Sequence, residues 1–260
     1  MTGDEAISPV RALRALNAAR RSDGASGSGG RRVDVDEGPV EVLEWLSSQG
    51  RKHDNLLVLD ESRSAAAGAL AELLPDAHVL APSLDDLGWA QSSEVAASTS
   101  VPAVVQVLDH FSIERAVLVG AAGAADLAVA VAVAHPDRVG ALVLINGGIG
   151  ASEERADVTV GTGSGSRSAL SGLRVPVAFL FGGSVAETMG YTPASVRAIT
   201  SWLRHVDAQH VAADEHEQFE ERALALVADI VEAQLAAVRA RAAHPATGSH
   251  RVITPVDDAN

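Results

Sequence analysis

Two short apolar runs on either side of an Ala/Val segment form the clearest pattern in the chain. Residues 117–120 and Val139–Ile145 are apolar throughout, which is typical of strands buried on both faces of a parallel sheet. Within residues 127–133, Leu or Val alternates with Ala, and this period of two alone would indicate a strand. The Ala content, the length of the segment and the following Pro136 instead favour a helix that is buried nearly all round. The pattern predicts a strand–turn–helix–strand unit, with its turn at residues 120–124.

The remaining pattern predicts further strands and helices on both sides of this unit. Gly and Pro in residues 36–39 indicate a tight turn between the first two strands, which predicts an N-terminal hairpin. The predicted strands are 33–35, 40–45, 56–60, 77–81, 175–182 and 209–212, and the predicted helices are 65–74, 101–111, 192–204 and 217–241. A long segment from residue 85 to residue 100 and the polar segment 147–174 are predicted to be loops.

The segment 117–146 resembles the nucleophile-elbow region of the α/β-hydrolases. In that family a G-x-S-x-G turn enters a helix, which is followed by HPxRVxxLVLIN, and the chain carries HPDRV at 135–139 and LVLIN at 142–146. The resemblance implies an α/β fold of the α/β-hydrolase type, with a mostly parallel central sheet, helices on both faces and an N-terminal β-hairpin. Because 147–174 is short and polar, we expect little or no cap domain.

The turn itself departs from the family pattern. Ala122 occupies the position where these enzymes carry the nucleophile, and Ala124 replaces the second Gly of the motif. A methyl group has no lone pair and no titratable proton, so it cannot attack a carbonyl carbon. We therefore expect a scaffold without its nucleophile.

The resemblance assigns three more parts of a catalytic site, and two of them are also altered. Ser184 and Val185 stand at the position of the acid, and neither is a carboxylate. The oxyanion loop reads Asp60-Glu61, whose charges would repel the developing oxyanion. Only His216 stands where the family places its base. The chain is thus expected to hold no intact catalytic triad.

The candidate ligand pocket is built from residues at this end of the predicted sheet and from one aromatic side chain on a long loop. Its members are Asp60, Glu61, Ala121, Ala122, Gly123, Trp89 and His216. Ser62 and Ser64 follow a strand, where Ser commonly caps the next helix. We expect no metal site and no cofactor, since the spacing of these residues requires neither.

Two functions remain open on these residues. The small-residue turn Gly120–Ala125 is similar to that of the Ndr family, whose members have an α/β-hydrolase fold and are regarded as non-enzymatic. This favours a catalytically inactive protein, a pseudoenzyme with a binding or scaffolding role toward an unidentified protein or small molecule. The alternative is an active, esterase-like hydrolase in which relocated groups such as Ser62 or Asp60 act with His216.

Composition limits the partners and the domain organisation. The 260 residues are 47% hydrophobic and carry a net charge of −14 without any Cys, which argues against nucleic acid as a partner and fits a cytoplasmic location. No apolar run approaches the ~18 residues of a membrane span. We expect one hydrolase-like domain over 33–243, between a flexible N-terminal tail (1–32) that could form a short helix and a flexible C-terminal tail (244–260).

Overall fold

A computed structural model of the protein describes residues 29–47, 54–60, 64–89, 94–147, 173–182, 206–211 and 216–243. The predicted helix at 192–204, most of the predicted loop at 147–174 and most of both predicted tails lie outside the described residues.

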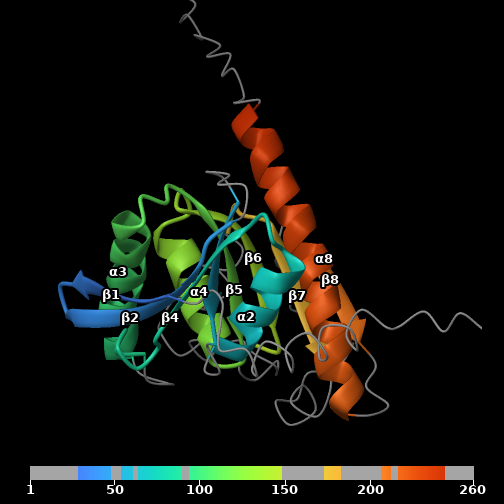
Figure 1. Ribbon diagram of the computed structural model, residues 1–260, viewed down its shortest axis with the longest axis horizontal. Helices are drawn as coiled ribbons and strands as arrows, with labels where there is room; N and C mark the ends of the chain where they lie inside the picture. The colour runs from blue at the N-terminus through green and yellow to red at the C-terminus, as the bar shows by residue number, and fades with distance from the viewer. Residues whose placement is uncertain are drawn as a thin grey trace, which may run out of the picture.

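The described strands form one mixed sheet in the order β1-β2-β4-β3-β5-β6-β7-β8 (Figure 1). β2 is antiparallel to β1 and to β4, and every other neighbouring pair is parallel. The strands are β1 (Gly29–Val35), β2 (Gly38–Trp45), β3 (Asn55–Leu59), β4 (His78–Pro82), β5 (Ala116–Ala121), β6 (Val139–Ile145), β7 (Val177–Gly182) and β8 (Val206–Val211). The predicted N-terminal hairpin and mostly parallel sheet are confirmed.

Helices cover both faces of this sheet. They are α2 (Ser64–Leu73), α3 (Glu94–His110), α4 (Ala124–Ala134) and α8 (His216–Ala243). Figure 1 shows α3 and α4 on one face and α2 and α8 on the other. Two separate apolar cores result, one beneath each helix pair.

The segment whose period was ambiguous is the helix α4. Leu127, Val129 and Val131 are each 0% exposed, because α4 packs on β3, β5 and β6 of the sheet and also contacts α3. A helix with neighbours on several sides needs no polar face, so the amphipathic period of 3.6 disappears from its sequence.

α8 packs on the other face of the sheet and covers the second apolar core. Gly140 in β6 makes the close approach possible, since a Cβ there would lie 2.7 Å from Val238 Cγ2 of α8. α8 is 28 residues long and its last turns extend past the sheet (Figure 1). Neither α8 nor any other described helix combines the length and apolarity needed to cross a membrane.

Three elements begin three residues or more before their predicted starts. β1 begins at Gly29, four residues before the predicted strand, because Gly29–Arg32 pair with β2 as far as Glu44. β8 begins at Val206, where its pairing with Val177 of β7 starts. The prediction that 94–100 belong to a loop is wrong, because α3 begins at Glu94 and contains Pro102 in its interior.

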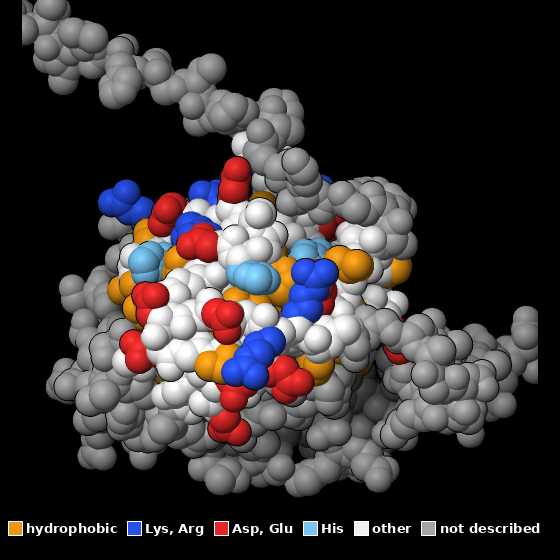
Figure 2. Space-filling model, turned by 60° about the vertical axis from the view of Figure 1, so that its left-hand side comes forward, with side chains coloured by type: hydrophobic (Ala, Val, Ile, Leu, Met, Phe, Trp, Pro, Cys, Tyr) orange, Lys and Arg blue, Asp and Glu red, His pale blue; other side chains and the backbone are white. Residues whose placement is uncertain are grey.

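Charged side chains of both signs are mixed on the face of the molecule that Figure 2 shows. In Figure 2, Lys and Arg side chains lie among Asp and Glu side chains, with His side chains and small apolar areas between them. This face therefore shows no field of a single sign.

Candidate functional site

The turn between β5 and α4 is sharply bent at Ala122. Its φ angle is +47°, in the left-handed region that residues other than Gly rarely adopt. The Ala122 N–H donates to the Ile145 carbonyl at 2.8 Å, and the Ala122 carbonyl accepts from the Ala125 N–H at 3.1 Å. These two bonds fix the turn to β6 on one side and to the first turn of α4 on the other.

Two glycines permit this bend. A Cβ at Gly120 would lie 2.7 Å from the Ala125 Cα, and a Cβ at Gly147 would lie 2.0 Å from the Ala122 carbonyl oxygen. Both neighbours are main-chain atoms, so they could not move aside as a flexible side chain could. At the motif's second Gly position the chain tolerates Ala124, whose side chain is buried in the core beneath α4.

The turn leaves backbone donors at the start of α4. Within the described residues, its hydrogen bonds use the N–H groups of Ala122, Ala125 and Asp126, and none uses those of Gly123 or Ala124. The first N–H groups of a helix lack acceptors within it and carry partial positive charge. Gly123 is only partly buried, so the turn offers a donor to an oxygen atom.

Asp60 belongs to the same end of the sheet. Leu59 pairs with Gly120 in the parallel ladder, so Asp60 and Ala121 leave adjacent strands side by side. Trp89 follows β4 and is 8% exposed within the core that also contains Ala124. Its indole N–H has no hydrogen-bond partner within the described part of the chain. The fold thus brings Asp60, Ala121, Ala122 and Gly123 to one end of the sheet, with Trp89 in the core.

The remaining predicted positions are only partly within the described chain. Glu61, Ser62, Ser184 and Val185 lie outside the described residues. His216 is the first residue of α8 and follows β8 after four residues, so the role of its side chain stays a prediction. Among the described residues, no group of three or more His, Asp or Glu side chains could hold a metal ion.

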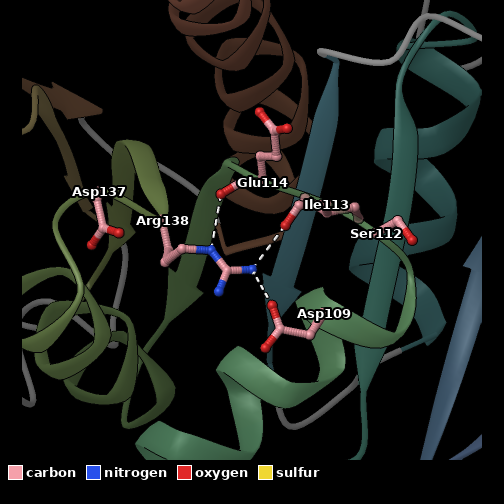
Figure 3. Close-up of a pocket in the computed structure, with 6 residues that line it drawn as sticks. All are labelled: Asp109, Ser112, Ile113, Glu114, Asp137 and Arg138. Atoms are coloured by element: carbon pink, nitrogen blue, oxygen red, sulfur yellow. Dashed lines mark hydrogen bonds and ion pairs between the residues drawn. The ribbon is translucent and has the colours of Figure 1, made fainter.

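A pocket of about 520 Å³ lies at the opposite, amino end of the parallel strands (Figure 3). In it, Arg138 of the HPDRV segment donates through Nε to the Glu114 carbonyl at 2.9 Å and through Nη2 to the Ile113 carbonyl at 2.9 Å. Nη2 also pairs with Asp109 at 2.7 Å. Arg138 therefore ties the α3–β5 connection to the α4–β6 connection, which is a structural role far from Ala122 along both strands.

A second polar cluster lies at the amino end and was not among the predicted site residues. Asp54 is 2% exposed and pairs with Arg239 of α8. Glu44, 7% exposed, accepts from Arg31 at 2.8 Å and His78 at 3.0 Å. Asp54 and Arg239 lie 185 residues apart, so no local pattern could have joined them.

Comparisons with known proteins agree with this architecture. No family model matches the chain. A 2-hydroxy-6-oxononadienedioate/2-hydroxy-6-oxononatrienedioate hydrolase from Paraburkholderia phymatum is 32% identical over 128 residues, which are 45% of this chain and 44% of the relative. The matched region thus spans less than half the length of this curated relative.

Solved structures share the fold over most of the chain. A proline iminopeptidase from Mycobacterium smegmatis superimposes with a TM-score of 0.63 at 15% identity, covering 80% of this chain and 99% of that chain. A variant of a meta-cleavage product hydrolase superimposes with a TM-score of 0.58 at 13% identity, covering 77% of this chain and 97% of that chain. Sheet order, helix layers and these superpositions together show that the chain has an α/β-hydrolase fold.

Proposed function

We propose that this protein is a catalytically inactive member of the α/β-hydrolase fold that binds a ligand or partner at the carboxyl end of its sheet. The observation that carries the proposal is Ala122, which sits in a left-handed turn between a buried strand and a buried helix. That strained turn is where hydrolases of this fold hold their nucleophile. Here it presents a methyl group, which supports no covalent step.

The backbone N–H donors next to Ala122 support the binding of a ligand oxygen without nucleophilic attack on the ligand. The Gly123 N–H at the start of α4 matches the kind of donor that stabilises a carbonyl oxygen in this fold. Asp60 follows β3 directly, and Leu59 before it pairs with Gly120 of β5, so a negative charge near this turn disfavours an anion. We therefore propose a neutral carbonyl or amide oxygen as the group that this turn binds, from a small molecule or a peptide.

The turn's composition supports a loss of chemistry rather than a change of it. Residues 120–125 contain only Gly and Ala, which is similar to the turn of the non-enzymatic Ndr family. A turn that has lost its nucleophile can still support the fold, and the surface around it can still bind a ligand or a partner protein.

Activity assays test the proposal directly. Purified protein is incubated with a fluorophosphonate probe and a panel of p-nitrophenyl esters, and neither labelling nor turnover is expected. Ala122→Ser is expected to restore no esterase activity, because the acid position and the oxyanion loop are also altered. Measurable turnover by Ala122→Ser would contradict the proposal, since it would show that the other catalytic groups are in place.

An active hydrolase is the second candidate, and the relatives favour it. The curated relative and the superimposed structures named above are described as hydrolases or peptidases. In this version Ser62 or Asp60 would act with His216, so the substrate panel includes the 2-hydroxy-6-oxononadienedioate named for the relative. Turnover of any member that His216→Ala abolishes would establish this candidate and end the first one.

A further inference from the structure

Asn146 is followed by Gly147, and this is the only Asn-Gly pair in the sequence. The structure explains why these two residue types meet here. Asn146 has a φ angle of +49°, in the left-handed region where Asn is enriched over most residues that carry a Cβ. A Cβ at Gly147 would overlap the Ala122 carbonyl oxygen, so no larger residue fits. The bend that joins β6 to the turn at Ala122 therefore favours this dipeptide.

An Asn-Gly pair is chemically reactive. The main-chain nitrogen of the Gly attacks the carbonyl carbon of the Asn side chain, a C–N bond closes a five-membered succinimide, and the side-chain nitrogen leaves as ammonia. One water molecule then opens the ring and gives either aspartate or isoaspartate, in which the main chain runs through the side-chain carbon. The attack is fastest when Gly follows, because no Cβ shields the nitrogen, and this reaction makes Asn a thermolabile residue.

The folded chain keeps the reacting groups from closing this ring. Asn146 is 4% exposed, and Gly147 is also buried. The Asn146 N–H donates to the Leu180 carbonyl of β7 at 3.0 Å, and the Ile145 carbonyl accepts from the Ala122 N–H at 2.8 Å. Ring closure requires the peptide group between residues 146 and 147 to rotate. Because that group is packed against the Ala122 carbonyl, these contacts must open first.

We propose that Asn146 is a site of spontaneous deamidation that the fold suppresses, and that its modification marks molecules in which the bend between β6 and the Ala122 turn has opened. The product re-forms this bend only at a cost in stability. Aspartate places a negative charge at a buried position, which is unfavourable without a partner. Isoaspartate adds one carbon atom to the main chain directly beside the turn.

Mass spectrometry of tryptic peptides from the full chain tests the proposal. The protein is incubated in mildly alkaline buffer, with or without guanidinium chloride at a concentration that unfolds it, and is then digested. Residues 139–155 form one tryptic peptide, which contains Asn146 and no other Asn or Gln. Its gain in mass, from the replacement of –NH₂ by –OH, is expected to be more than about tenfold slower in the folded protein, because only the open fraction reacts.

The same digest supplies a matched control. Residues 53–63 form a tryptic peptide with Asn55, which is also buried but is followed by Leu56, so this peptide should stay unmodified over the same time in both conditions. Equal rates for the 139–155 peptide in folded and unfolded protein would overturn the proposal. The absence of any mass gain in that peptide under both conditions would also overturn it.

A variant measures the cost of the modification. Asn146→Asp reproduces the aspartate product, and Asp is also enriched in the left-handed region, so the main difference is the charge. We expect its folding equilibrium constant to be lower than that of the wild type by more than about tenfold at neutral pH. This deficit should shrink at acidic pH, where the new carboxyl group is neutral, and a variant that folds only in acid supports the same conclusion. Wild-type stability at neutral pH would show that the product keeps the turn, which would refute the predicted cost.

Discussion

Replacing Ala122 by Gly should stabilise the protein, although Gly substitutions usually destabilise. At φ +47°, a side chain with a Cβ costs about 1–2 kcal/mol relative to a residue that accepts the left-handed region freely. Gly removes that cost, but it also gives the unfolded chain more freedom, which offsets about 0.4–1 kcal/mol. The two terms leave a net gain of about 0.5–1 kcal/mol for Ala122→Gly.

The measurement is the free energy of unfolding from urea denaturation, with an unchanged m value as the check that the transition is the same. Ala233→Gly is the matched control, because Ala233 is exposed inside α8 and the same chemical change there should cost about 1 kcal/mol. A loss of stability in Ala122→Gly comparable to that of Ala233→Gly would refute the left-handed turn, and with it the strained scaffold on which the proposed function rests.

Three further substitutions test the packing around the site, each by urea denaturation. Gly147→Ala should destabilise by about 3 kcal/mol or more, since its Cβ would lie 2.0 Å from the Ala122 carbonyl oxygen; a loss below 1 kcal/mol would contradict that contact. Gly140→Ala should cost about 1–2 kcal/mol, and combining it with Val238→Ala should cost less than the sum of the two single changes; strict additivity would argue against the α8 contact. Leu127→Ala, at a side chain that is 0% exposed, should cost about 2–5 kcal/mol, and a loss under 1 kcal/mol would contradict its burial.

The fold was predictable where a short stretch of sequence determines its own secondary structure. Val139–Ile145 is apolar throughout and is a strand over those same residues. The helix α4 was identified from its Ala content and from Pro136, despite an alternating pattern. The start of α3 was missed because the segment before residue 101 was assigned to a loop, whereas α3 begins at Glu94. In the structure Pro102 lies inside the helix, so the missing N–H is tolerated well beyond the first turn.

The candidate site was likewise predictable only where its residues are neighbours in the sequence. The turn at Ala122 could be located because Gly120 and the segments around it form a short contiguous motif. The pairing of Asp54 with Arg239 could not be located, because it depends on the path of the chain between them. Two polar residues that lie 185 positions apart produce no period and no motif, so only the assembled sheet reveals that they pair.

The packing of α8 also governs when the protein can finish folding. Val117, Ala141 and Ala178 belong to the core that α8 covers, and Val231 and Val238 close it from the other side. During synthesis the part of that face that α8 covers stays without its cover until the chain has been made past Val238. We therefore expect the partly made chain to expose this apolar surface and to bind chaperones that shield such surfaces.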